Sequence, residues 1–140
     1  MSAPSGTARR ATALRAVEAG LWLAFWVPLA GCTWLALTPS PPDAVFRVSD
    51  VLLHGFAFSY LAFALGLAHR LRPLPVALWL LAYGAGLELL QSQQPGRMPE
   101  FKDLAVDAAG IAVGLALLWA LGARVRRLAQ WVLERLLPGH

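Results

Sequence analysis

The stretch Leu104–Gly122, with the sequence LAVDAAGIAVGLALLWALG, decides the class of this protein. It is almost continuous Leu, Ala, Val and Gly, and its length suits the ~17–25 residues that a helix needs to cross ~30 Å of hydrocarbon. A membrane β-strand would alternate polar and apolar residues over about ten positions, and this stretch does not alternate. We therefore expect a transmembrane helix here.

Three further apolar runs of similar length precede this stretch. They are Val17–Thr38 (VEAGLWLAFWVPLAGCTWLALT), Val51–Ala68 (VLLHGFAFSYLAFALGLA) and Leu74–Leu90 (LPVALWLLAYGAGLELL). Of the 140 residues 58% are hydrophobic and only 14% are charged, whereas a soluble domain carries roughly 25% charged residues. The sequence predicts an all-α polytopic membrane protein with four transmembrane helices. Pro28 lies inside the first run, which a membrane helix tolerates when a neighbouring helix satisfies the freed carbonyl.

Lysine and arginine are distributed unevenly between two sets of connecting segments. One set holds Arg9, Arg10, Arg15, Arg70, Arg72, Arg124, Arg126, Arg127 and Arg135, and the other holds Arg47, Arg97 and Lys102. The positive-inside rule places the richer set in the cytoplasm. We expect a multi-pass protein of the bacterial inner (cytoplasmic) membrane with both termini cytoplasmic. Because topology explains the arginines and the net charge of +4, no nucleic-acid partner is predicted.

The same pattern divides the chain into three segments. Residues 1–16 are expected to be a cytoplasmic N-terminal tail, residues 17–123 a four-helix membrane domain, and residues 124–140 a cytoplasmic amphipathic helix and tail. In the last segment, apolar residues at helical spacing face away from a basic side. Such a helix either lies along the inner leaflet or extends the fourth helix into the cytoplasm.

The motif Leu29-Ala-Gly-Cys32 is similar to a bacterial lipoprotein signal, which would be cleaved and lipidated at Cys32. The apolar run continues past the cysteine through Trp34 and Leu37, so it has the length of a full span and exceeds a signal core of 7–15 residues. We expect the first run to remain a transmembrane helix.

Polar residues interrupt the apolar runs at positions that the topology brings to one end. They lie near the start of the second helix, at the end of the third, in the following loop, and at the start of the fourth. The set comprises Asp50, His54, Glu88, Gln91, Arg97, Asp103 and Asp107. Because each span reverses the direction of the chain, all of them fall at the depth of the outer leaflet. We predict that they form one ligand-binding site.

Two glycines continue the polar stripe of the fourth helix. Gly110 and Gly114 follow Asp103 and Asp107 at spacings of three or four residues, so all four share one face. A small-xxx-small pair allows close approach of two membrane helices. We predict helix packing at Gly110 and Gly114.

Three interpretations of the polar set stay open. The first is a structural clamp that ties the helices together. The second is a binding site for the headgroup of an anionic lipid or glycan, with Arg97 in contact with phosphate. The third is the active site of a metal-assisted enzyme that acts on a phosphorylated envelope lipid. The sequence contains no HExxH or CxxC zinc spacing, so a divalent cation rests on clustering alone and no cofactor is predicted. Catalytic residues are therefore not assigned.

From about Trp34 to Leu118 the chain resembles the VanZ-like membrane proteins. The shared features are the loop LALTPSPP, Asp50-x-x-x-His54 followed by aromatic residues, Glu88-x-x-Gln91, a Pro-Gly-Arg97 turn, Asp103, and Gly110-x-x-x-Gly114. This chain has Val51 where the family usually has Lys, and Asp107 where it usually has Asn. The family takes its name from a protein linked to resistance to the glycopeptide antibiotic teicoplanin. The resemblance implies a small outer-face site that interacts with membrane lipids or a lipid-linked envelope precursor.

Overall fold

The computed structural model describes residues 6–38, 50–69, 72–93 and 101–136. These residues form four helices and no strand: α1 (Gly6–Leu37), α3 (Asp50–His69), α4 (Pro73–Gln91) and α5 (Phe101–Leu136). Each helix is long and apolar enough to cross a membrane. The prediction of an all-α, multi-pass membrane protein with four transmembrane helices is confirmed.

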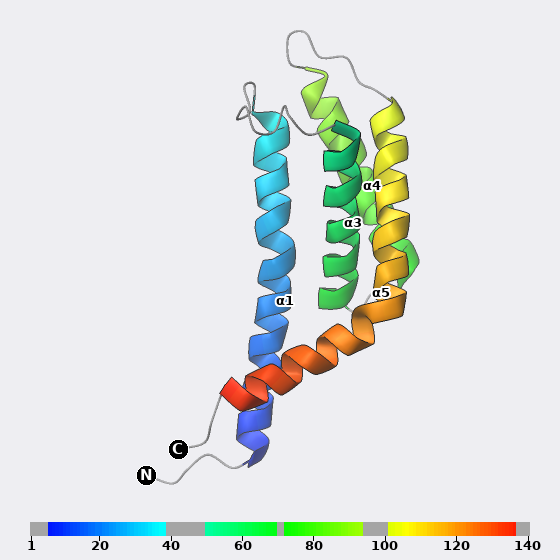
Figure 1. Cartoon of the computed structure of the whole chain (residues 1–140). Helices are drawn as coiled ribbons and strands as arrows, with labels where there is room; N and C mark the ends of the chain where they lie inside the picture. Colours follow the sequence, from blue (N-terminus) through cyan, green and yellow to red (C-terminus); the bar gives the residue numbers. More distant parts are fainter. Residues whose placement is uncertain (1–5, 39–49, 70–71, 94–100, 137–140) are drawn as a thin grey trace.

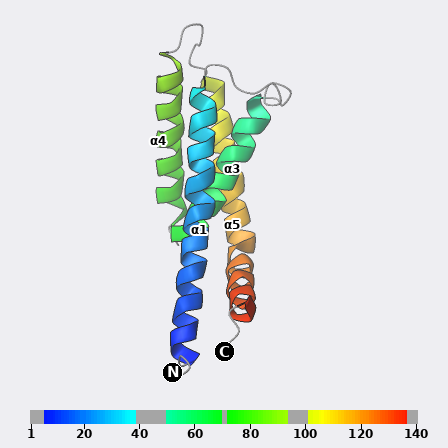
Figure 2. The ribbon, with the colours of Figure 1, turned by 90° about the vertical axis from the view of Figure 1, so that its left-hand side faces the viewer.

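The helices run alternately up and down (Figure 1). In that view α1 and α4 end, and α3 and α5 begin, at the top, which we call the upper end. The opposite end, where α1 begins and α5 ends, is called the lower end. Figure 1 shows α3 between α1 and α5, and Figure 2 shows the bundle from the side, with α1 in front and α4 at the left. The upper end therefore collects the starts of α3 and α5 and the end of α4, as the topology argument requires.

Two of the helices extend beyond the apolar runs of the sequence. Residues 6–16, expected within an N-terminal tail, are the first turns of α1. Residues 124–136, expected as an amphipathic helix that lies along the inner leaflet or extends the fourth helix, are continuous with α5. Both stretches are rich in Ala, Arg and Leu, which have high helix propensity, and neither begins with a proline that would break the helix.

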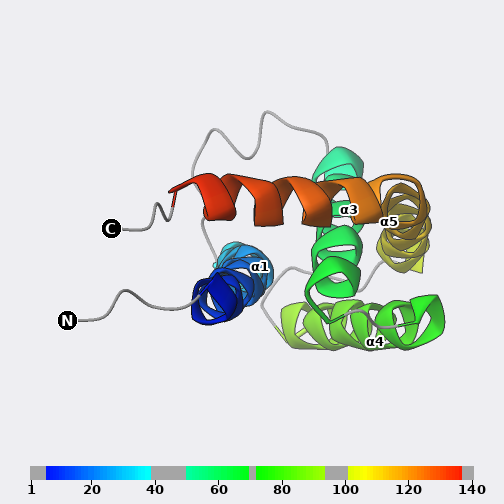
Figure 3. The same ribbon diagram turned by 90° about the horizontal axis from the view of Figure 1, so that it is seen from below.

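The continuous helix α5 nevertheless changes direction near its orange part, and its red part crosses the lower end towards α1 (Figures 1 and 3). We call residues 124–136 the C-terminal arm. Gly122, just before the arm, is buried, and a Cβ atom there would lie 3.0 Å from Leu118 Cδ1. Glycine is one of the usual sites of a helix bend. The arm is fixed to the bundle by Arg126, whose guanidinium donates a hydrogen bond to the backbone oxygen of Leu67 in the last turn of α3.

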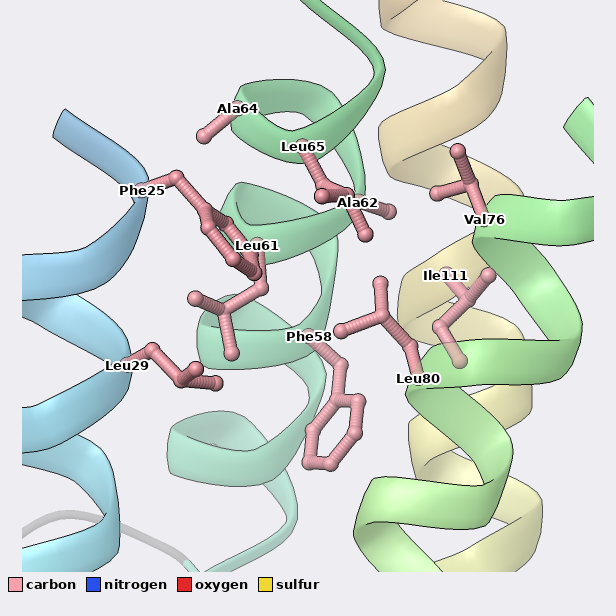
Figure 4. Close-up of a cluster of buried hydrophobic side chains, with 10 residues drawn as sticks. All are labelled: Phe25, Leu29, Phe58, Leu61, Ala62, Ala64, Leu65, Val76, Leu80 and Ile111. Atoms are coloured by element: carbon pink, nitrogen blue, oxygen red, sulfur yellow. The ribbon is translucent and has the colours of Figure 1, made fainter. Parts of the chain in front are cut away.

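The apolar core centres on α3 (Figure 4). This helix contributes half of the buried cluster, and the other three helices pack around it. The cluster comprises Phe25 and Leu29 of α1, Phe58, Leu61, Ala62, Ala64 and Leu65 of α3, Val76 and Leu80 of α4, and Ile111 of α5. In a membrane the lipid tails are as apolar as these side chains, so the cluster stabilises the bundle through close packing rather than through removal of water.

Helices α3 and α5 make the most intimate contact, through glycine. A Cβ atom on Gly110 would lie 2.5 Å from the backbone oxygen of Gly55, and one on Gly114 would overlap the backbone oxygen of Ser59. No side chain larger than hydrogen fits at either position without moving the α3 backbone. The two glycines therefore let α5 approach the α3 main chain directly, which is the packing role that the small-xxx-small spacing predicts.

Helix α1 is held by side-chain hydrogen bonds from its neighbours. Pro28 has no N–H, so the carbonyl of Ala24, four residues earlier, has no helical donor. The Tyr60 hydroxyl of α3 donates to this carbonyl with an O–O distance of 2.7 Å. The neighbour that a proline in a membrane helix requires is thus present. A second link joins the hydroxyl groups of Thr33 and Tyr83, 2.8 Å apart, between α1 and α4.

Candidate functional site

The centre of the polar set is a histidine–carboxylate pair. His54 lies in the second turn of α3 and Asp107 in the second turn of α5. The His54 Nδ1 and Asp107 Oδ1 atoms are 2.9 Å apart. The side chain of Asp107 is 1% exposed and that of His54 is 21% exposed. The buried carboxylate of Asp107 is therefore bonded to the imidazole of His54, which is partly exposed at the surface of the protein.

Glycine provides the space in which Asp107 is buried. Gly84 of α4 is buried, and a Cβ atom there would lie 2.6 Å from Asp107 Oδ2 and 3.1 Å from Phe58 Cζ. Helix α4 can therefore pack against the carboxylate and the phenyl ring only because residue 84 has no side chain. Phe58, one turn below His54 on α3, has its ring centroid 6.4 Å from that of His54. Because Phe58 belongs to the apolar core, the polar pair lies directly against that core.

Two more of the predicted acids lie in the same region of the fold. Asp103 is one helical turn before Asp107 on α5, and it is 7% exposed. Glu88 is half-buried in the last turn of α4. Together with Asp107 they bring three carboxyl groups to the upper end of the bundle. A buried carboxylate in a membrane protein is costly unless it is paired, protonated or in contact with a polar ligand, so this end is chemically distinct from the rest of the molecule.

Gln91 is turned towards α1 instead of the histidine–carboxylate pair. Its side-chain Nε2 donates to the backbone oxygen of Ala36 with an N–O distance of 2.8 Å. Ala36 lies in the last turn of α1, where backbone carbonyls commonly bond to side chains. Gln91 therefore satisfies the end of a helix and ties α4 to α1 at the upper end.

Two predicted site residues cannot be placed relative to the pair. Asp50 is the first residue of α3, and its side chain lies outside the described residues, as does Arg97 in the connection between α4 and α5. Within the part of the chain that the structure describes, no group of three His, Cys, Asp or Glu side chains has a metal-binding arrangement. The described geometry thus provides a hydrogen-bonding site.

Sequence reasoning missed Gly84 and the direct pairing of His54 with Asp107. One signal for Gly84 was available: Gly84, Glu88 and Gln91 recur at i, i+4 and i+7, so Gly84 extends the polar stripe of α4 by one turn. The pairing had no local signal. Helical spacing shows which residues share a face of one helix, and it does not show which face meets which.

Comparison with known proteins gives no match at any of three levels. No family model matches the sequence, no curated protein is similar to it, and no solved structure is similar to its fold.

Proposed function

We propose that this chain is a VanZ-like integral membrane protein of the bacterial cytoplasmic membrane whose upper-end polar site binds the headgroup of an envelope lipid or a lipid-linked precursor. The observation that carries the proposal is the His54–Asp107 pair, with its buried carboxylate and partly exposed imidazole. The order of motifs from the Ser/Pro loop to Gly114 is the basis for the family assignment.

In our proposal the imidazole of His54 recognises the headgroup. In our proposal the carboxylate of Asp107 accepts a hydrogen bond from Nδ1–H of His54, whose Nδ1 atom lies 2.9 Å from Asp107 Oδ1. The second ring nitrogen, Nε2, is then an acceptor, and it belongs to a side chain that is 21% exposed. A headgroup hydroxyl or ammonium donates hydrogen bonds, and it would be recognised by Nε2 together with the carboxylates of Glu88 and Asp103.

Two basic residues that precede Asp103 in the chain would supply positive charge beside these carboxylates. Lys102, in the first turn of α5, is exposed one residue before the buried Asp103. In our proposal Lys102 and Arg97 contact the phosphate of the same ligand, because cations bind phosphate oxygens through charge-assisted hydrogen bonds. A phosphate flanked by hydroxyl or amine groups is the shared chemistry of phospholipid headgroups and of lipid-linked sugar carriers.

The structural clamp is the main competing interpretation. A clamp needs only that polar groups bond across helices, and Gln91, Thr33 and Tyr83 do this. The His54–Asp107 pair differs from these links because two further carboxyl residues, Glu88 and Asp103, lie at the same end of the bundle within one turn of the pair along α4 and α5. A metal-assisted enzyme has less support, since the described residues offer no set of three ligands.

Native mass spectrometry of the protein purified in a mild detergent tests the proposal. We compare wild type with His54→Ala, and with Thr33→Val as a matched control that removes a hydrogen bond between helices away from the pair. The proposal predicts a bound lipid in wild type and Thr33→Val, and its loss from folded His54→Ala protein. If His54→Ala folds and retains the same lipid, or if no variant carries any lipid, the headgroup site is wrong.

A further inference from the structure

The C-terminal arm has two sides with different surroundings. On its inner side Val125, Ala129 and Leu133 are half-buried, and Arg126 bonds the end of α3 through the backbone oxygen of Leu67. Figure 3 shows the arm passing across the lower end, beside α3 and towards α1, rather than continuing along the axis of α5. The arm is therefore held across the direction in which the helices cross the membrane.

The outer side of the arm combines large apolar side chains with arginine. Leu128 is 61% exposed, Trp131 is 53% exposed and Val132 is 37% exposed. Arg124, Arg127 and Arg135 are exposed on the same side of the helix, because residues spaced by three, four or seven share one face. The guanidinium of Arg135 lies over the Trp131 ring, 4.8 Å from its centroid.

This combination suits the boundary between headgroups and acyl chains. The four helices are long and apolar enough to cross a membrane, so a segment that lies across their lower end would be close to one membrane surface. There an exposed Trp and Leu can enter the hydrocarbon edge while arginines remain among the headgroups. The arm carries four arginines and one glutamate, so its charge complements anionic lipids and not zwitterionic ones.

We propose that the C-terminal arm is an anionic-phospholipid-binding surface, in which Arg124, Arg127 and Arg135 bind headgroup phosphates and Leu128 and Trp131 enter the bilayer edge. This surface is separate from the polar site at the upper end and does not depend on it. Each arginine near an anionic surface contributes roughly a fivefold preference for that surface, and salt weakens the attraction.

A fluorescent probe on the arm tests the proposal in the full-length protein. Cys32→Ser removes the single native cysteine, and Leu128→Cys then carries an environment-sensitive fluorophore. The labelled protein is placed in nanodiscs of phosphatidylcholine, with or without phosphatidylglycerol. We expect the emission to shift to the blue when phosphatidylglycerol is present, and high salt to reverse the shift. A probe at Val113→Cys, an exposed position in the middle of the span, should not respond to lipid charge.

Two arginine triple variants separate the arm from general basicity of the lower end. Arg124→Gln/Arg127→Gln/Arg135→Gln should abolish the response, whereas Arg10→Gln/Arg15→Gln/Arg72→Gln removes three exposed arginines outside the arm and should preserve it. Circular dichroism and thermal unfolding identify any variant that has lost its fold, and for such a variant the single Arg127→Gln replaces the triple. The proposal is overturned if the emission is insensitive to phosphatidylglycerol, if both triple variants lose the response equally, or if the probe is equally blue-shifted in detergent, which would indicate a protein contact.

Discussion

His54 and Asp107 are separated by 53 residues in the chain, and their Nδ1 and Oδ1 atoms are 2.9 Å apart. The contact joins the second turn of α3 to the second turn of α5, next to the glycines through which these helices touch. The close approach of the backbones and the polar pair therefore support one another: glycine brings the helices together, and the pair fixes their register at the upper end.

A double-mutant cycle should reveal this mutual support. His54→Ala or Asp107→Ala alone leaves its former partner unsatisfied, and the double variant removes both groups, so its cost should be less than the sum of the two. We expect a coupling free energy of about 0.5–1.5 kcal/mol, the range for hydrogen bonds in membrane proteins, measured by reversible unfolding in mixed detergent–SDS micelles. Additive effects of the two substitutions would show that the contact contributes nothing to the fold.

Close packing at Gly114 predicts a large effect from a single methyl group. Gly114→Ala places a Cβ atom against the Ser59 backbone oxygen, so α3 and α5 must separate, at a cost of about 1–3 kcal/mol. Gly20→Ala is the matched control, because a Cβ atom there meets nothing within 4 Å. This control should be neutral or gain up to ~1 kcal/mol from helix propensity. Equal stability of the two variants in the same unfolding assay would contradict the observed α3–α5 packing.

The proline in α1 makes the role of Tyr60 testable. Tyr60→Phe removes the donor to the Ala24 carbonyl, and we expect it to destabilise the protein by about 0.5–1.5 kcal/mol. Pro28→Ala restores a helical N–H to that carbonyl, so Tyr60→Phe should cost distinctly less in the Pro28→Ala background. If the tyrosine substitution costs the same with and without the proline, the hydroxyl does not serve the freed carbonyl.

The arginine distribution predicts the orientation in the membrane, and reporter fusions can test this prediction. A green fluorescent protein fused after His140 should fluoresce, whereas alkaline phosphatase at the same position should be inactive, because both the positive-inside rule and the even number of spans place this end in the cytoplasm. Alkaline phosphatase inserted between residues 94 and 100 is the converse control and should be active. The opposite pattern of activities would reverse the assignment and place the polar site at the cytoplasmic face.

The transmembrane helices could be predicted from the sequence because length and hydropathy are properties of each helix alone. The shared depth of His54, Glu88 and Asp107 followed from counting spans, since direction alternates at every crossing. The bounds of α1 and α5 were less accessible, because Ala, Arg and Leu continue a helix beyond the hydrocarbon as readily as within it. Hydropathy therefore marked where the apolar runs end and missed where the helices end.

The contacts between helices were not accessible to the same reasoning. The Tyr60–Ala24, Gln91–Ala36 and Arg126–Leu67 hydrogen bonds depend on how each helix is rotated about its axis, and in each of them the acceptor is a backbone carbonyl. Pro28 accounts for the Ala24 carbonyl, which lacks a helical donor. The Ala36 and Leu67 carbonyls lie in the last turns of α1 and α3. A search for carbonyls without helical donors would have identified all three acceptor regions and none of the three donors.

The most direct test of the headgroup site is nuclear magnetic resonance of the histidine side chains. The chain has three histidines: His54 in the site, His69 against Trp22 near the lower end, and the terminal His140. Delipidated protein labelled with ¹⁵N-histidine is titrated with an envelope lipid extract, and with synthetic phosphatidylcholine as the control. The site predicts that the Nε2 resonance of His54 shifts with the extract alone while that of His69 stays in place. A His54 resonance that is unchanged by the extract, or that moves only in step with His69, would contradict headgroup binding at the His54–Asp107 pair.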